Sequence, residues 1–291
     1  MHEGARFSRG LSDQLLEELK QGRFSMLLRA LAGRGLDVQL RERYIDVYAR
    51  GCRVLMLVER RFREGRYRAS IHRKYLDGLV LPDARSGSER DQYVHFCASP
   101  DFVEGYVASL DTILWNSEGY VKPEAELEEH MIWQSHCRSS PVLFIDRQVQ
   151  VHRIRRRADL IGVTTCSADR ARVVLVELKQ GLDTRIQHLM GQMGQYREVI
   201  APDGRLDHEV AAAYRRVVAQ KQELGLLPPA AVFPDEDPSV ECLLVLADYN
   251  PKSELLTRLR HRARDASYGA RLVLLEKGTH ILPPAAQWEE L

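Results

Sequence analysis

The chain has 291 residues, of which 44% are hydrophobic and 29% charged, as is typical of a soluble protein with one large or two modest domains. Its 42 lysines and arginines almost balance 41 acids, so any nucleic-acid surface must be a local patch. The absence of an apolar run of about 18 residues and of a signal-peptide core predicts a cytoplasmic protein with no membrane partner. Five scattered cysteines without a Cys-x-x-Cys argue against a disulfide framework or a zinc knuckle.

The first part of the chain predicts a smaller α+β domain over residues 1–118. Leucines at helical spacing predict a helix across Leu11–Leu31, which Gly33 and Gly35 stop. Apolar runs separated by turns then predict strands at Val38–Tyr48, Val54–Val58 and Tyr67–Ile71. The remaining segments are expected to be a polar loop at Leu81–Asp101, a short helix at Phe102–Trp115 and a linker at Asn116–Lys122.

This first domain carries a concentrated positive charge. Between Arg41 and Lys74 there are ten arginines and one lysine against four acids, interleaved with tyrosine and phenylalanine. Cations mixed with aromatic rings on a small sheet suit a nucleic-acid backbone and its bases, and we single out Arg60, Arg61 and Arg63. A solvated face, with arginine stems covering the sheet, explains the same pattern equally well.

The second part, residues 119–291, predicts an α/β domain in which helices alternate with apolar strands. Pro123 followed by Glu124, Glu126 and Glu128 is typical of a helix N-terminus. Strands are expected at Val142–Ile154, Asp159–Val163, Val173–Gln180, Glu241–Ala247 and Ala270–Glu276. Helices are expected at Thr184–Ile200, Glu209–Leu226 and Ser253–Arg264.

Two of these strands carry the residues that point to a reaction. Residues two apart on a strand project from the same face, so Glu177 and Lys179 point together. If the neighbouring strand presents Asp159 beside them, two carboxylates and an ammonium converge where a divalent cation and a water could bind. Asp159, Glu177 and the carbonyl of Leu178 would then be metal ligands, and Lys179 would orient or deprotonate the water.

The chain contains its own control for this motif. The letters Glu-Leu-Lys-Gln-Gly occur at Glu18–Gly22 as well as at Glu177–Gly181. The first copy lies in a leucine pattern of helical period, where residues two apart face nearly opposite ways. The second copy follows the β-branched run Val173–Val176. We therefore expect a shared face only in the second copy.

A further pair narrows the class of enzyme. Gln192 and Tyr196 are four residues apart on the expected helix after the Glu-x-Lys strand, so an amide and a phenol share a helix face. Together with Asp159, Glu177 and Lys179, this pair resembles the PD-(D/E)xK nuclease superfamily, in its RecB-like branch marked by Gln-x-x-x-Tyr. The layout is also similar to NucS-type DNA endonucleases. Ala158, not proline, precedes Asp159, and members of the family often lack this proline.

The resemblance implies a restriction-endonuclease-like core, with a four-stranded mixed sheet flanked by helices, and Mg²⁺ or Mn²⁺ dependence. It implies that Glu124 is the helix carboxylate, with Glu126 and Glu128 as alternatives, and that Gln192 and Tyr196 belong to the site. The expected function is hydrolysis of DNA phosphodiester bonds with 5′-phosphate products, in repair, restriction or phage defence. RNA is not excluded as a substrate, and a homodimer is compatible.

Two questions stay open at this stage. Arg155 and Arg157 lead into the Asp159 strand, where they would bind phosphate or be solvated. The alternative to an enzyme is a catalytically silent subunit that binds nucleic acid or assembles with other proteins and keeps the nuclease fold.

Overall fold

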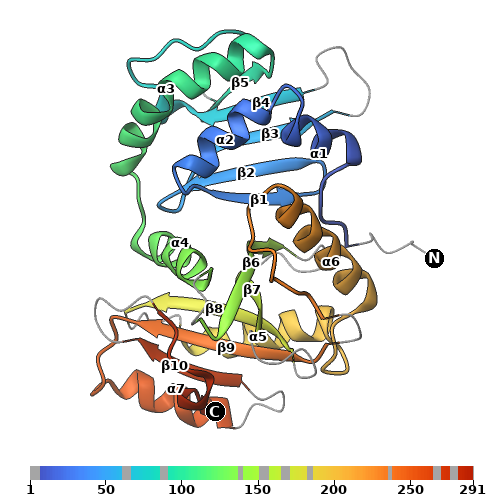
Figure 1. Cartoon of the computed structure of the whole chain (residues 1–291). Helices are drawn as coiled ribbons and strands as arrows, with labels where there is room; N and C mark the ends of the chain where they lie inside the picture. The colour runs from blue at the N-terminus through green and yellow to red at the C-terminus, as the bar shows by residue number, and fades with distance from the viewer. Residues whose placement is uncertain are drawn as a thin grey trace, which may run out of the picture. The chain divides into compact units, whose positions relative to one another are not determined.

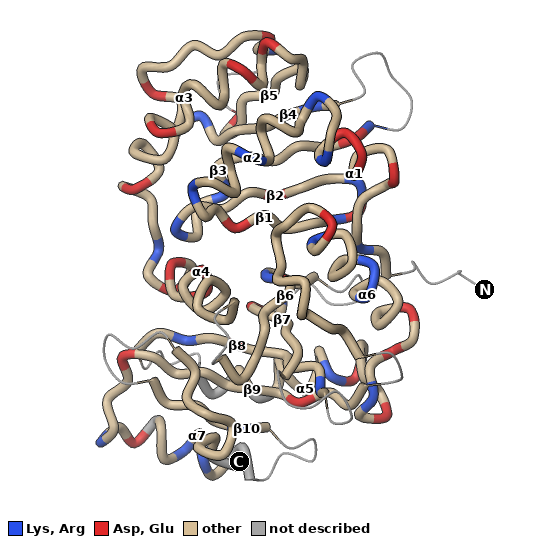
Figure 2. Tube along the Cα trace, viewed as in Figure 1, with Lys and Arg blue, Asp and Glu red and all other residues tan. Residues whose placement is uncertain are grey.

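The computed structural model describes residues 7–60, 67–85, 91–136, 140–150, 157–164, 171–181, 186–234, 238–264, 270–275 and 281–290. The chain divides into two compact units. Unit 1 consists of residues 1–8, 130–218 and 230–291, and unit 2 of residues 9–129 and 219–229. Within the described residues, no helix has the length and apolar character needed to cross a membrane. Lys and Arg positions occur together with Asp and Glu positions in both units, in line with a net charge of +1 (Figure 2).

Unit 2 is built on a five-stranded antiparallel sheet in chain order (Figure 1). Its strands are β1 (Asp37–Arg41), β2 (Tyr44–Ala49), β3 (Cys52–Glu59), β4 (Tyr67–His72) and β5 (Tyr93–Cys97). The expected strand Val38–Tyr48 was wrong, because Arg43 adopts a φ of 63° and turns the chain between β1 and β2. The expected loop Leu81–Asp101 was also wrong in part, since β5 lies within it and completes the sheet beside β4.

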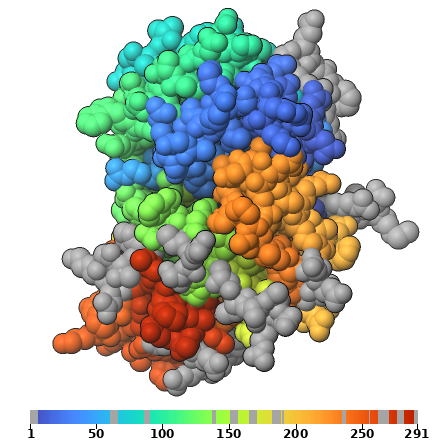
Figure 3. Space-filling view, viewed as in Figure 1, coloured from blue at the N-terminus to red at the C-terminus, as the bar shows by residue number. Residues whose placement is uncertain are grey.

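Helices cover one face of this sheet. They are α1 (Asp13–Lys20), α2 (Ser25–Gly33) and α3 (Pro100–Glu118), and a short 3-10 helix, η1 (Arg73–Leu76), follows β4. The single expected helix Leu11–Leu31 is two helices, because the chain turns at residues 21–24 before Ser25 starts α2. Leucines of α1 and α2 are buried in one core with the strands, and the same segment forms the blue surface in Figure 3.

Unit 1 is built on a six-stranded mixed sheet of order β11-β10-β9-β8-β7-β6. Its strands are β6 (Val142–Gln150), β7 (Arg157–Thr164), β8 (Val173–Gln180), β9 (Val240–Ala247), β10 (Ala270–Leu275) and β11 (Glu289–Glu290). β6, β7 and β8 pair antiparallel, whereas β8, β9 and β10 pair in parallel. Nearly continuous burial of β8 and β9 explains their unbroken apolar runs, because both faces of these strands are covered.

The helices of unit 1 are α5 (Ile186–Ile200), α6 (His208–Glu223) and α7 (Glu254–Arg264), and the last turn of α6 belongs to unit 2. α5 packs on β8 and β9, and α7 packs on α5. The helix α4 (Pro123–Ser135) begins in unit 2 and ends in unit 1. Its end is tied to the sheet of unit 1, because the backbone N–H of Phe144 donates to Ser135 Oγ at 3.0 Å.

The expected fold class is confirmed: an α/β unit with a mixed sheet and flanking helices follows a smaller α+β part. The sheet has six strands where four were expected, since β10 and β11 extend it beyond β9. The boundary expected between residues 118 and 119 stays a prediction.

Candidate active site

The pairing of β7 with β8 brings Asp159 and Glu177 together. The paired positions run from Val163 opposite Val173 to Leu160 opposite Val176. One step further along the same register, Asp159 stands opposite Glu177, and opposite residues in an antiparallel pair share a face. Lys179 lies two residues beyond Glu177 and projects from that face as well.

The ammonium group of Lys179 lies at the centre of this cluster. Its Nζ is 3.7 Å from Asp159 Oδ2 and 3.4 Å from Glu177 Oε1. The same group donates to the backbone carbonyl of Leu178 at 2.6 Å. One positive charge is therefore surrounded by the three oxygens that the sequence pattern predicts as metal ligands.

Both carboxylates are almost removed from solvent. Asp159 is 8% exposed and Glu177 is 5% exposed. A buried carboxylate is stable only when it is paired or hydrogen-bonded, and here the backbone N–H of Leu178 donates to Asp159 Oδ2 at 2.8 Å. The orientation of the Asp159 side chain is thus fixed by the strand that carries Glu177 and Lys179.

The donor set fits a hard divalent cation. Two carboxylates and a backbone carbonyl are the oxygen ligands that Mg²⁺ and Mn²⁺ prefer. With one ammonium among them, the three side chains carry a net charge of −1, which favours a cation beside them. Among the described residues, no group of three or more His, Cys, Asp and Glu side chains gathers in a way that could hold a metal. Asp159 and Glu177 supply only two such side chains, and the third oxygen near Lys179 is the backbone carbonyl of Leu178.

Tyr196 lies close to the candidate site. It comes from α5, is 3% exposed, and lines a small pocket together with Glu177, Leu175 and Met193. Gln192 is one helical turn earlier on α5 and is half-buried. The packing of α5 on β8 explains why Tyr196 reaches the face that carries Glu177. The role predicted for the Gln-x-x-x-Tyr pair stays a prediction.

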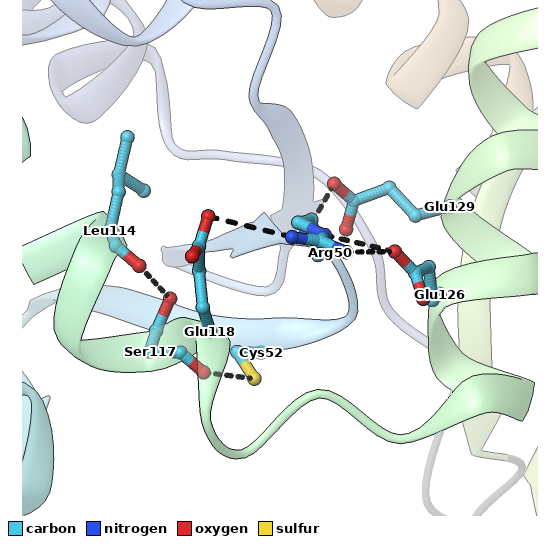
Figure 4. Close-up of polar contacts among 7 residues, drawn as sticks. All are labelled: Arg50, Cys52, Leu114, Ser117, Glu118, Glu126 and Glu129. Carbon is cyan, nitrogen blue, oxygen red and sulfur yellow. Dashed lines mark hydrogen bonds and ion pairs between the residues drawn. The ribbon is translucent and has the colours of Figure 1, made fainter.

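The glutamates of α4 have different environments. Arg50, in the turn between β2 and β3, donates through Nε and Nη2 to Glu126 Oε1 at 2.9 and 2.7 Å (Figure 4). The carboxylate of Glu129 accepts from the backbone N–H groups of Arg50 and Gly51, both at 2.6 Å. Both glutamates thus fasten α4 to a turn of unit 2.

Glu124 and Glu128 lie one turn apart on α4. Glu124 is half-buried, whereas Glu128 is 3% exposed and follows Leu127 in the buried part of the helix. Gly51 allows α4 to approach the β2–β3 turn, because a Cβ at its position would lie 2.5 Å from the Cβ of Ala125. The assignment of the helix carboxylate to Glu124, with Glu126 and Glu128 as alternatives, stays a prediction.

The control copy of the motif is helical, as expected. Glu18 and Lys20 lie in α1 and have separate partners on the surface. Glu18 Oε2 accepts from the backbone N–H of Arg23 at 3.0 Å, and Lys20 pairs with Glu223 at 2.6 Å. The same five letters therefore form a convergent cluster only where they extend a strand.

The arginines expected to bind nucleic acid are only partly described. Arg61, Arg63 and Arg155 lie outside the described residues. Arg157 is exposed at the start of β7, two residues before Asp159. Arg60 directly follows β3 and is half-buried.

Arg60 belongs to a cluster of positive charge that the basic stretch Arg41–Lys74 indicated in part, since Arg85 and His95 lie outside that stretch. Burial lowers the pKa of Arg68, on β4, and the positive charges of Arg60 and Arg85 lower it further. The Nε of Arg68 is buried without a hydrogen-bond partner in the described part of the chain. The alternation of β4 could have indicated this cluster, because Arg68 and Ser70 share the face opposite the buried core.

His95 completes this basic cluster, which we define as Arg60, Arg68, Arg85 and His95. Its Nδ1 is 2.8 Å from Ser70 Oγ, across the β4–β5 pair. Burial lowers the pKa of His95, as do the charges of Arg68 and Arg60, whereas Asp91 raises it. Because Arg60 and Arg85 both repel Arg68, an anionic ligand is favoured beside Arg68.

Comparison with known proteins gives little further support for the candidate active site. No protein family model matches the sequence, and no curated protein matches it. The crystal structure of a repair endonuclease from Pyrococcus abyssi is similar over 82% of this chain and 78% of that chain, at 14% identity and a TM-score of 0.20. A similarity of this strength supports no conclusion about the present chain.

Proposed function

We propose that this protein is a metal-dependent nuclease that hydrolyses phosphodiester bonds of DNA. The observation that carries the proposal is the convergence of Asp159 Oδ2, Glu177 Oε1 and the Leu178 carbonyl on the ammonium of Lys179, within 2.6 to 3.7 Å. Carboxylates can hold the metal ion that assists hydrolysis, and an amine beside them can act on the attacking water.

Hydrolysis of a phosphodiester needs an attacking water in line with the leaving oxygen, and neutralisation of the charge on the phosphate. A bound Mg²⁺ or Mn²⁺ supplies Lewis acidity and a template for these groups. Asp159, Glu177 and the Leu178 carbonyl would hold this cation. A helix carboxylate, Glu124 in the sequence assignment, would complete its ligands.

Lys179 would act on the water and on the phosphate. Its side chain is 14% exposed, and its Nζ lies beside the two buried carboxylates. From this position an amine can orient a water by hydrogen bonding and can stabilise the developing negative charge on the phosphate. Tyr196 and Gln192 would position the substrate or the water from the α5 side.

The basic cluster of unit 2 is the surface we assign to the nucleic-acid backbone. Phosphate groups supply the anionic partner that Arg60, Arg68 and Arg85 need, and arginine binds phosphate with a planar fork of donors. Tyr93 adds an aromatic ring on the same sheet, with the guanidinium of Arg53 5.0 Å from its centroid. This combination suits a polyanion with bases that can stack.

A catalytically silent subunit is the second candidate. The observation that favours it is the same cluster. An ammonium that pairs with two carboxylates and donates to a carbonyl can stabilise the fold without binding a metal. A silent subunit would bind DNA with the basic cluster but leave it intact.

One experiment separates the two candidates. The protein is incubated with single-stranded, duplex and branched DNA in Mg²⁺, in Mn²⁺ or in EDTA, and the products are resolved by length. Metal-dependent cutting that disappears in Asp159→Asn and Lys179→Ala supports the nuclease. Binding without cutting supports the silent subunit, and cutting that survives both substitutions contradicts the site.

A further inference from the structure

Unit 2 contains a cavity that takes no part in the proposed function. Its volume is about 540 Å³, within the range of roughly 300–1,000 Å³ that is typical of ligand sites. It is lined by residues of η1, of the loop that follows η1, of β5, and by Tyr120, just beyond the end of α3. Most of the lining side chains are apolar, and they include Leu76, Leu79, Leu81, Val94 and Phe96.

The loop after η1, which forms one wall of the cavity, is fixed at both ends. At its start, the side-chain amide of Asn116, on α3, donates to the backbone carbonyls of Tyr75 and Asp77 at 3.1 and 2.9 Å. At its end, Ala84 forms a β-bridge with Phe96 of β5. The wall is therefore held in place, so a ligand would lose little binding free energy in ordering it.

The apolar surface of the cavity continues onto its rim. Val80 is 98% exposed although its loop is fixed, and Tyr120 is 44% exposed. A small molecule enclosed in the cavity would leave Val80 in water. A peptide that crosses the rim would cover Val80 while one of its side chains enters the cavity, and apolar surface at the edge of a cavity is typical of such protein contacts.

The charges around the cavity favour an acidic group beside the apolar anchor. Two cations, Arg73 and Lys74, line it together with one acid, Asp77. The Nζ of Lys74 lies 4.6 Å from the centroid of the Tyr120 ring, and within the described residues no carboxylate pairs with this ammonium. The backbone N–H of Lys74 donates to His72 Nδ1 at 3.2 Å, which fixes the start of η1. A carboxylate of the ligand would give Lys74 an ionic partner.

A nucleobase fits this cavity less well than an apolar side chain does. The edge of a base carries hydrogen-bond donors and acceptors, and against leucine and valine side chains these groups would lose their water without gaining a partner. An aliphatic or aromatic side chain has no such groups to satisfy. The lining of the cavity therefore favours a protein partner over DNA.

We propose that this cavity binds an acidic, hydrophobic peptide segment of a partner protein. A large apolar side chain of the peptide occupies the cavity, and a neighbouring carboxylate pairs with Lys74. The inference goes beyond the proposed nuclease activity and does not depend on it, because the cavity shares no residue with the candidate active site.

The test uses a peptide that is selected on the full-length protein. A library of random displayed peptides is panned against the protein, and the most enriched peptide is synthesised with a fluorescein label. We expect the enriched peptides to share a large apolar residue next to Asp or Glu. In fluorescence anisotropy, Val80→Asp should weaken binding of the labelled peptide at least about 10-fold, because it removes an apolar contact and repels the carboxylate of the peptide.

Two further variants sharpen this measurement. Val232→Asp changes a valine that is 63% exposed outside the cavity, and this matched control should bind the peptide like the wild type. Lys74→Gln should weaken binding about 3–10-fold at low salt and less at high salt, because salt screens the ion pair. Val80 and Lys74 are both exposed, so their variants should melt near the wild-type temperature.

The proposal is overturned if the library yields no peptide whose binding Val80→Asp weakens, or if Val232→Asp weakens that binding equally. If single-stranded DNA displaces the peptide and Val80→Asp weakens DNA binding by the same factor, the cavity belongs to a nucleic-acid interface instead. If dodecanoate displaces the peptide and binds the wild type and Val80→Asp equally, the cavity is a site for a small amphipathic carboxylate.

Discussion

The backbone N–H of Leu178 donates to Asp159 Oδ2 at 2.8 Å, so a side chain of β7 is held by the backbone of β8 beyond the paired part of the two strands. This hydrogen bond fixes a buried carboxylate to the strand that carries Glu177 and Lys179. The carbonyl of the same leucine accepts from Lys179 at 2.6 Å. The backbone of β8 at Leu178 thus orients both an acid and an amine.

This bond predicts a difference between two substitutions of Asp159. Asparagine keeps an oxygen that can accept from Leu178, so Asp159→Asn should fold with nearly unchanged stability. Alanine leaves a buried N–H without this acceptor, which should cost about 1–3 kcal/mol of unfolding free energy. Both variants should lose metal-dependent cleavage of DNA. Urea unfolding and a nuclease assay test the prediction, and an active Asp159→Asn protein would contradict the metal-ligand role.

Lys179 has a matched control in the chain. Lys179→Ala should lower the cleavage rate by about 10²–10⁴-fold, because it removes the group that orients the water. Lys20 occupies the same place in the first Glu-Leu-Lys-Gln-Gly copy but lies on α1 and pairs with Glu223 on the surface. Lys20→Ala should cleave DNA like the wild type. If both variants lost the same cleavage rate in single-turnover assays, the lysine of this motif would affect the stability of the protein and not the chemical step.

The sequence predicts the centre of the site because only local geometry is needed. A strand places Glu177 and Lys179 on one face by its period of two, and the β-branched run before them identifies the strand. The environments of Glu126 and Glu129 could not be predicted, since their partner Arg50 lies 76 and 79 residues earlier in the chain and contacts them only in the folded protein.

The errors in the fold have equally specific causes. The periodic leucines of Leu11–Leu31 continue across a turn, because α1 and α2 pack on the same core and keep the same buried pattern. Apolar and polar residues alternate on both sides of Arg43, so the sequence pattern predicts one long strand where the structure has the hairpin of β1 and β2. A non-glycine residue with positive φ carries no strong sequence signal for the turn it makes.

Arg68 allows a test of the basic cluster that separates binding from folding. Arg68→Gln should weaken DNA binding, and the slope of log K against log salt should fall by about 0.7–0.9 for each phosphate that the variant no longer neutralises. The unfolding free energy should not decrease, because the substitution relieves repulsion from Arg60 and Arg85. Arg34, whose guanidinium is already paired with both oxygens of Asp111, is the control. Arg34→Gln should leave the salt slope unchanged, and an equal slope in Arg68→Gln would remove the cluster from the interface.

His95 makes the stability of unit 2 depend on pH. Burial and the charges of Arg68 and Arg60 lower its pKa below the ordinary value of 6.5 in the folded protein. Between that lowered pKa and 6.5 the unfolded chain binds more protons than the folded chain, so stability falls as the pH decreases below 6.5. Urea midpoints measured from pH 8 to pH 5 should show this fall. His95→Gln should make it shallower, and an unchanged pH profile in this variant would contradict the placement of His95 among positive charges.

The helix carboxylate can be identified by substituting the glutamates of α4 one at a time. Glu124→Gln should lower metal-dependent cleavage, because it removes the charge of the proposed helix carboxylate at the start of α4. Glu129→Gln should instead lower stability, by about 1–3 kcal/mol, because a charged acceptor of two backbone N–H groups is lost. Glu126→Gln should weaken only the pair with Arg50.

If Glu124→Gln cleaves DNA normally and Glu128→Gln does not, the ligand role passes to Glu128, whose side chain is the more buried of the two. Cleavage assays paired with urea unfolding on all four variants decide between these assignments.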